Sequence, residues 1–235
     1  MKLKITFISD THTKHRYCEE DLPGGDFLIH SGDFMNSGYY EREAFEFLEW
    51  FNGVKGYDKK IFIAGNHDRL FENDKVKKYE LLKQFPNLVY LEDESWGYYL
   101  MDIDRSIKFY GSPWQPEFYN WAFNLPRNGS ELEEKWSMIP PDTDILITHG
   151  PPQGHLDTSG APYSQPLLGC EVLRTYVDII KPKIHVFGHI HGSAGYKFHE
   201  GTHFFNASIL GEKYYYENKP VTIEWNPETN DLTFT

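Results

Sequence analysis

Short polar segments hold the residues of this sequence whose types and spacing are best suited to chemistry. Asp10 and His12 are two residues apart, and so are His189 and His191. Side chains at i and i+2 of an extended backbone point to one side, so each pair can offer two ligands to one site. The other candidates are Asp33, Asn66, His67 and His149. All eight carry oxygen or nitrogen donors, which suit zinc, iron, manganese and similar metals.

The number of these donors indicates more than one metal ion. The histidines alone exceed what a single ion needs, and with the carboxylates and the amide they are enough for two ions. Two ions about 3.5–4 Å apart suit in-line displacement at phosphorus. A carboxylate would bridge the ions, a hydroxide between them would attack phosphorus, and an acid would protonate the leaving oxygen. The pattern therefore predicts hydrolysis of a phosphate ester.

The segments follow five predicted strands, which must bring them together. We expect these strands over residues 3–8, 27–30, 60–64, 145–148 and 183–187. Ligands of open α/β sheets bind outside the carboxyl ends of strands, so the segments should converge there. Helices are expected over 41–51, 75–85 and 167–180, a hairpin over 96–110, and antiparallel strands near Tyr196, Phe204, Thr222 and Leu232. This order favours two packed sheets flanked by helices.

Length and composition favour a cytoplasmic protein with one domain over residues 1–235. A chain of 235 residues fits a single α/β domain. Its net charge of −12 argues against extended nucleic-acid binding. The N-terminal apolar run is too short for a signal peptide, and no stretch approaches the roughly 18 apolar residues of a membrane span. The two cysteines, Cys18 and Cys170, are expected to be free thiols in a reducing compartment.

Taken in order, the polar segments resemble the signature of the calcineurin-like metallophosphoesterase superfamily. The matching motifs are Asp10-Thr11-His12, Gly32-Asp33, Gly65-Asn66-His67-Asp68, Thr148-His149-Gly150 and Gly188-His189-Ile190-His191. The resemblance implies an α/β fold, a four-layer α-β-β-α sandwich of two mixed sheets. It also implies two divalent metal ions as cofactors, with Mn, Fe, Zn, Co and Ni all compatible with the donors.

The resemblance further implies a role for each residue. Seven would bind metal: the first ion would take Asp10, His12 and His191, the second Asn66, His149 and His189, and Asp33 would bridge both. His67 would protonate the leaving group or steady the phosphoryl oxygens, which Asn66 would also contact. Asp68 would orient His67 by a hydrogen bond.

A closer resemblance is to the MPPED-type branch, whose relatives are linked to cyclic nucleotide phosphodiesterase activity. It is carried by residues 63–67, 111–114, 123–127, 148–152 and 185–191. It implies a phosphodiesterase acting, through a metal-bridging hydroxide, on a small nucleotide-like substrate, cyclic nucleotides included. A phosphomonoesterase acting on a nucleotide or a small phosphorylated metabolite is the alternative, because it would share every catalytic residue. A non-catalytic metal-binding scaffold is less favoured, since no ligand is missing.

Contacts to the rest of the substrate are less sharply predicted. The aromatic residues between Trp114 and Phe123 should mostly be core, with Trp114 as a wall on which a base could stack. Arg127 could either pair with a phosphate or cap a loop. The remaining histidines are given structural positions. We expect a buried place in the core for His30 and His185, and a surface place for His15, His155, His199 and His203.

Overall fold

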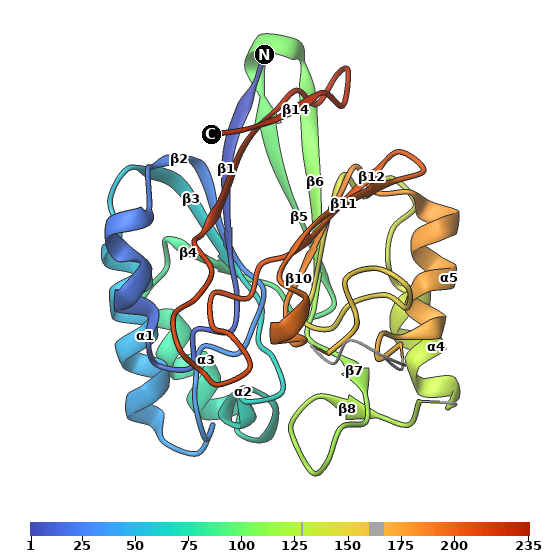
Figure 1. Cartoon of the computed structure of the whole chain (residues 1–235). Helices are drawn as coiled ribbons and strands as arrows, with labels where there is room; N and C mark the ends of the chain where they lie inside the picture. The colour runs from blue at the N-terminus through green and yellow to red at the C-terminus, as the bar shows by residue number, and fades with distance from the viewer. Residues whose placement is uncertain (128, 160–166) are drawn as a thin grey trace.

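Two six-stranded sheets packed face to face form the centre of the protein in a computed structural model that describes residues 1–127, 129–159 and 167–235 (Figure 1). The first sheet has the order β14-β13-β1-β2-β3-β4. Its strands are β1 (Leu3–Ile8), β2 (Gly25–His30), β3 (Tyr57–Phe62), β4 (Leu88–Tyr90), β13 (Val221–Trp225) and β14 (Leu232–Phe234). Strands β1 to β4 are parallel, while β13 and β14 add an antiparallel edge.

The second sheet has the order β11-β12-β10-β9-β6-β5. Its strands are β5 (Glu94–Leu100), β6 (Arg105–Ser112), β9 (Ile145–Thr148), β10 (Ile184–Phe187), β11 (Gly195–His199) and β12 (Thr202–Asn206). The four central strands are parallel, and β5 and β11 close the edges in antiparallel pairing. A small separate sheet pairs β7 (Gln115–Pro116) with β8 (Asn124–Leu125). Both large sheets are therefore mixed, as the resemblance implied.

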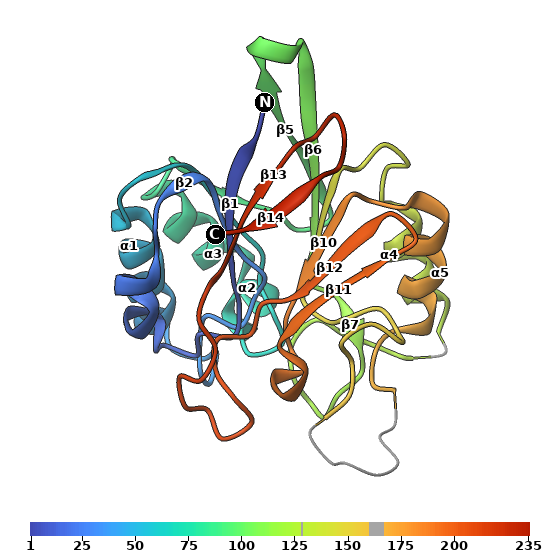
Figure 2. The same cartoon turned by 45° about the horizontal axis from the view of Figure 1, so that its top comes forward.

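Helices cover the outer face of each large sheet, which gives four layers (Figures 1 and 2). Beside the first sheet lie α1 (Glu41–Gly53), α2 (Arg69–Asn73) and α3 (Lys75–Lys83). Beside the second lie α4 (Ser130–Ser137) and α5 (Glu171–Ile180). Short 3-10 helices also occur, η1 (His15–Asp21), η2 (Met101–Ile103) and η3 (His191–Ser193). The predicted α-β-β-α sandwich is confirmed.

Alternation along the strands explains the layers. In β1, Ile5 and Phe7 lie in the buried cluster between the two sheets, together with Ile147 of β9. Ile8 instead belongs to the cluster beneath α1 and contributes to the opposite face of the strand. Because successive side chains alternate between faces and both faces are covered, the strands are apolar almost throughout. The polar segments begin where these apolar runs end.

Three expectations about the elements need correction. Strand β3 ends at Phe62 rather than at residue 64, because the chain then leaves the sheet to carry the next polar segment. Residues 167–170 are not helical: Cys170 is the residue before α5, and its sulfur accepts a hydrogen bond from the Leu173 N–H. Strand β12 pairs in parallel with β10, although it pairs antiparallel with β11 as expected.

Buried histidines and cysteines complete the interior. His30 and His185 are buried as predicted. The surface positions expected for His15, His155 and His203 are wrong, since all three are buried, whereas His199 is 40% exposed. Aromatic neighbours explain this: the ring of His155, for example, stacks on Phe204 with a centroid distance of 4.0 Å. The cysteines, Cys18 and Cys170, are both free and buried, as expected. Within the described residues, no helix has the length and apolar character to cross a bilayer.

Candidate metal centre

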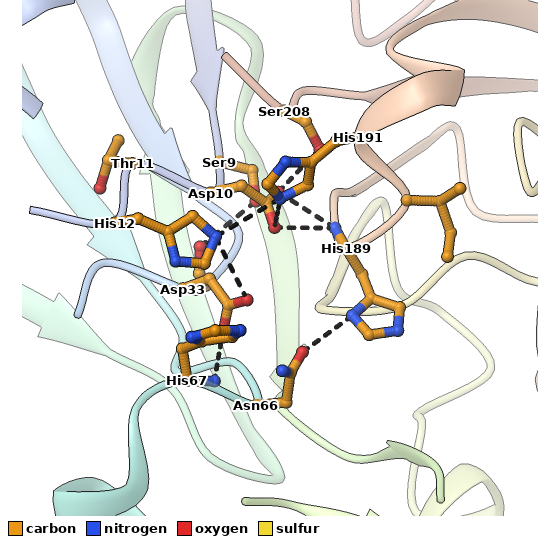
Figure 3. A network of polar contacts seen from close by, with 12 residues as sticks. Ser9, Asp10, Thr11, His12, Asp33, Asn66, His67, His189, His191 and Ser208 are labelled. Atoms are coloured by element: carbon orange, nitrogen blue, oxygen red, sulfur yellow. Dashed lines mark hydrogen bonds and ion pairs between the residues drawn. The ribbon is translucent and has the colours of Figure 1, made fainter. Parts of the chain in front are cut away.

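The polar segments meet at the carboxyl ends of β1, β2, β3, β9 and β10 (Figures 1 and 3). Backbone hydrogen bonds join them: the Asp10 N–H donates to the Gly32 carbonyl at 2.9 Å, and the Gly188 N–H donates to the His149 carbonyl at 2.9 Å. Figure 3 shows the side chains of Asp10 and His191 facing one another from different sheets. The convergence expected from the sequence is present.

Unusual backbone geometry turns the ligands inward. Asp10, His12, Asp33 and His189 have positive φ angles of 53°, 40°, 59° and 68°. Non-glycine residues adopt this left-handed region seldom and at a cost, and such residues cluster at functional sites. Gly188 is needed for a related reason, because a Cβ there would lie 2.0 Å from Asp10 Oδ2. The loops are thus shaped for these side chains, at the expense of local stability.

A first group of donors consists of Asp10, His12 and His191, whose ligand atoms all lie within 4.8 Å of one another. His191 Nε2 is 3.3 Å from Asp10 Oδ1. His12 Nε2 is also 3.7 Å from Asp33 Oδ2, so the bridging candidate is close to this group. The first group has the members that the resemblance implied for the first ion.

A second group consists of Asp33, His149 and His189, again within 4.8 Å. Asn66 joins it, because its Oδ1 lies 2.8 Å from both His149 Nε2 and His189 Nδ1. Asp33 Oδ2 is 3.3 Å from His149 Nε2. Since Asp33 is near both groups, it is positioned to serve both. A third combination, His12, Asp33 and His67, also meets the 4.8 Å limit.

The charge balance of the centre fits a bound cation. Burial raises the pKa of Asp10, but its hydrogen bond to His191 and the charges of nearby histidines outweigh this and hold the pKa well below its usual value. The pKa of Asp33 is likewise lowered, chiefly by His149. Both carboxylates are buried, and in the described part of the chain only histidines form ion pairs with them. Buried negative charges of this kind require positive partners, and divalent ions supply them.

The pKa values of His12 and His189 also suit a bound metal ion. Burial lowers the pKa of His12 to about 4 and that of His189 to about 3, so both are neutral at pH 7. Neutral imidazole is the form that binds metal. Burial also opposes protonation of His149, but the charge of Asp33 outweighs it and raises the pKa to about 9. Metal binding would therefore displace a proton from His149.

Further polar groups orient the ligands. The Nδ1 atoms of His149 and His191 lie 3.0 Å and 3.1 Å from the carbonyls of Ser31 and Gly211. A carbonyl can only accept, so these contacts place the proton on Nδ1 and leave Nε2 for a metal. The buried Ser208 hydroxyl lies 2.8 Å from Asp10 Oδ2. Sequence reasoning missed Ser208 and Gly211, because no motif or spacing marks them.

Asp68 does not orient His67 by a side-chain hydrogen bond as predicted. Its carboxylate accepts hydrogen bonds from the backbone N–H groups of Asp33, Met35 and Gly65, at 2.9, 2.8 and 2.7 Å. It therefore holds together the loops that carry Asp33 and Asn66. The Nδ1 of His67 instead contacts the Asn36 carbonyl.

Trp114 and Arg127, which the sequence suggested as substrate contacts, have other neighbours. Trp114 donates from Nε1 to Asp93 at 2.9 Å, and Lys135 lies over its ring at 4.4 Å. Arg127 donates to the carbonyls of Leu168 and Gly169, both at 2.8 Å. Trp114 thus packs beneath the surface, and Arg127 has the partners of a loop cap. Neither side chain turns a free polar group toward the metal centre.

A cavity of about 380 Å³ lies beside the metal centre, and both His189 and His191 line it. Aromatic side chains flank it on two sides. Phe118 stands edge-on to His189 at a centroid distance of 5.6 Å, and Tyr214 packs against His12 and His191 at 4.8 and 5.0 Å. The expectation that the aromatic stretch is mostly core is therefore wrong: Phe118 is 49% and Tyr119 77% exposed, Trp114 and Trp121 are half-buried, and of the five only Phe123 is fully buried.

Comparison with known proteins settles the family. Residues 3–193 match the model of the calcineurin-like phosphoesterase family. The chain belongs to this family. It is 41% identical to the human Metallophosphoesterase domain-containing protein 1, over 94% of this chain and 70% of the human one. It is 37% identical to a Caenorhabditis elegans UPF0046 protein, over 90% and 77%.

Solved structures agree with this family fold. A Thermus thermophilus protein has a TM-score of 0.65 at 12% identity and covers 100% of this chain and 99% of its own. A putative 5'-nucleotidase from Staphylococcus aureus has a TM-score of 0.59 at 14% identity, over 100% of this chain and 53% of its own. At such identities the likeness concerns the fold alone. Together, the family membership and the donor groups establish a metal-dependent phosphoesterase that acts on small phosphorylated substrates.

Proposed function

We propose that this phosphoesterase hydrolyses phosphodiesters in small nucleotide-like molecules, cyclic nucleotides included, with two divalent metal ions. The observation that carries the proposal is the pair of donor groups that lie on either side of Asp33, which is 3.7 Å from His12 in one and 3.3 Å from His149 in the other, beside one cavity. The first ion would be held by Asp10, His12 and His191, the second by Asn66, His149 and His189, and both by Asp33. When bound, the ions would activate a water molecule and neutralise charge on the phosphoryl oxygens.

His67 is proposed to supply the proton for the leaving group. Its Nδ1 contacts the Asn36 carbonyl, which can only accept, so Nδ1 carries a proton and Nε2 remains for the substrate. The acid form is therefore the imidazolium, which carries a second proton on Nε2. As the bond from phosphorus to the leaving oxygen breaks, His67 would donate this Nε2 proton to that oxygen and become neutral imidazole with its proton on Nδ1. Asn66 turns Oδ1 toward two histidines, which leaves its amide N–H groups to donate to a phosphoryl oxygen.

The cavity favours a diester over a monoester. A diester keeps a second alcohol attached to phosphorus and carries one negative charge, whereas a monoester carries up to two. Arg127 lines the cavity but is paired with Glu171 at 2.7 Å, and Glu117 lies on the same wall. This wall supplies little net positive charge for a dianion but has room and apolar surface for an alcohol group. Phe118 and Tyr214 would contact that group.

Two finer points belong to the same proposal. Manganese is proposed among the ions that support activity, because the donors are oxygens and imidazole nitrogens without a thiolate. A cytoplasmic location is proposed because Cys18 and Cys170 remain free, which suits a reducing compartment.

The test compares chromogenic esters. Purified protein loaded with Mn²⁺ is assayed with bis-p-nitrophenyl phosphate and p-nitrophenyl phosphate, and then with cyclic nucleotides. We expect kcat/KM for the diester to exceed that for the monoester. The opposite order would favour the phosphomonoesterase. Failure to turn over any diester with Mn, Fe, Zn, Co or Ni would overturn the proposal.

A further inference from the structure

A column of planar groups runs from the protein surface to His67. The ring of Trp121 stacks on the His67 imidazole, with a centroid distance of 3.9 Å and an interplanar angle of 24°. The guanidinium carbon of Arg69 lies 4.7 Å from the Trp121 ring and 5.1 Å from the ring of Tyr39. We call Tyr39, Arg69, Trp121 and His67 the His67 stack. Face contacts of this kind, with a cation between aromatic rings, stabilise a fixed relative orientation.

The other contacts of His67 leave the plane of its ring loosely defined. The backbone N–H of His67 donates to Asp33 Oδ1 at 2.7 Å, which fixes the main chain but not the imidazole. Nδ1 contacts the carbonyl of the exposed residue Asn36, and His12 touches the ring edge-on. A histidine ring turns easily about its terminal torsion, because that torsion has broad wells. A flat surface against the imidazole face removes this freedom, and Trp121 supplies it.

The loop that carries Trp121 is tied to the same segment as His67. The Ala122 N–H donates to the Asn66 carbonyl at 3.0 Å, and Arg69 donates to the Asn120 carbonyl. Arg69 begins α2 two residues after His67. Trp121 and His67 are therefore held on one framework that also includes the metal-binding candidate Asn66.

We propose that Trp121 is a positioning residue for His67, with Arg69 holding Trp121 in place. The stack would keep Nε2 aimed at the leaving oxygen, where a displacement of about 1 Å can cost roughly 10²-fold in rate. Trp121 stacks on the His67 ring and is not among the described residues that line the cavity beside His189 and His191. We therefore expect it to act through His67. This inference rests on the proposed function, because it requires His67 to be the acid.

The test uses Trp121→Ala, Trp121→Phe and a control, Tyr119→Ala. Tyr119 lies in the same loop and is 77% exposed, and among the described residues its ring contacts that of Phe118. The substrates are methyl aryl phosphodiesters whose leaving phenols differ in pKa. For poor leaving groups, which need a proton most, we expect Trp121→Ala to lower kcat by roughly 10–10²-fold. For p-nitrophenol the loss should be small, and KM and bound metal should not change. Trp121→Phe should restore most of the rate, and Tyr119→Ala should behave as wild type.

A second measurement separates positioning from general stability. His67→Ala and the double variant His67→Ala/Trp121→Ala should have equal rates, because Trp121 would act only through His67. An equal loss for good and poor leaving groups, or a further loss in the double variant, would overturn the inference. If Trp121→Ala does not fold, Trp121→Leu, which keeps bulk without a flat face, takes its place in both comparisons. Absence of diesterase activity in the wild type would instead refute the proposed function.

Discussion

The two sheets contribute different chemistry to the metal centre. Loops after the first sheet supply both carboxylates, Asp10 and Asp33, together with His12. Loops after the second sheet supply the histidines His149, His189 and His191 to the donor groups. Among these donors the negative charge thus comes from the first sheet, whereas histidines come from both sheets, and each donor group draws on both. The metal centre therefore depends on the packing of the two sheets, and Asp33 lies near both donor groups.

Removing Asp33 should have the largest effect on metal binding and activity. In Asp33→Ala we expect the chain to lose both ions and its diesterase activity to fall to background, because the carboxylate that lies near both donor groups is removed. Metal content by inductively coupled plasma mass spectrometry, with turnover on the same sample, checks this. The matched control is Asp142→Ala, which removes an exposed carboxylate paired with Lys108. This variant should keep both its metal content and its activity. Retention of two ions by Asp33→Ala would show that Asp33 is not a bridge.

Removing His67 separates acid catalysis from metal binding. His67→Ala should keep its metal content but slow diester turnover by roughly 10²–10⁴-fold. His67 also falls within 4.8 Å of His12 and Asp33, so the metal measurement matters as much as the rate. Loss of an ion in His67→Ala would reassign this residue as a ligand. An unchanged rate would remove it from the mechanism.

Ser208, which follows β12 and contacts Asp10, offers a smaller and more local perturbation of the first donor group. Ser208→Ala removes the hydroxyl beside Asp10 Oδ2 but leaves every proposed ligand in place. We expect metal affinity to weaken by roughly 10–10²-fold, with near-normal turnover at saturating metal. Competition with a chelator measures the affinity. An unaltered affinity would mean that Asp10 is held by its other contacts.

A buried histidine away from the metal centre should make the free energy of unfolding depend on pH. Buried His155 has a pKa lowered to about 4, chiefly by burial, whereas the unfolded residue titrates near 6.5. Below pH 6.5 the unfolded chain binds a proton that the folded chain does not, so stability falls as pH falls toward 4. One such group contributes about 1.4 kcal/mol per pH unit. His155→Phe should reduce the slope of unfolding free energy against pH between 6.5 and 4.

The partners of His155 make this substitution feasible. Its ring stacks on Phe204, and among the described residues neither ring nitrogen has a hydrogen-bond partner, so a phenyl ring can occupy the place. Tyr79→Phe, at a 67% exposed position on α3 beside the other sheet, is the control and should leave the slope unchanged. An unchanged slope in His155→Phe would show that His155 is protonated in the folded protein.

Sequence reasoning predicted the parts of the site that lie directly after strands. Strand β1 ends at Ile8 and β9 at Thr148, as their apolar runs indicate, and the ligands follow at once. Ser208 and Tyr214 could not be predicted in this way. They approach the centre only because β12 pairs in parallel with β10 and returns the chain to it, a pairing that residue patterns do not encode.

The errors have related physical causes. His15 and His155 were expected at the surface because histidine is polar, but aromatic neighbours that are distant in sequence bury them. The family resemblance implied that Asp68 would hydrogen-bond to His67. Its carboxylate instead reaches backbone N–H groups of two loops, including that of Asp33, 35 residues away along the chain. The order of residues along the chain was enough to identify the motif that contains Asp68. Its hydrogen-bond partners, however, are set by contacts between segments that are distant in sequence.

The measurement that tests the central claim most directly is diesterase activity as a function of bound metal. Metal-free protein is titrated with Mn²⁺, and bound ions per chain are determined alongside turnover of bis-p-nitrophenyl phosphate. Because Asp33 lies near both donor groups and is proposed to bridge the ions, we predict that two ions bind and that activity rises mainly with the second. Full activity at one ion per chain, or saturation of binding at one ion, would contradict the two-metal account.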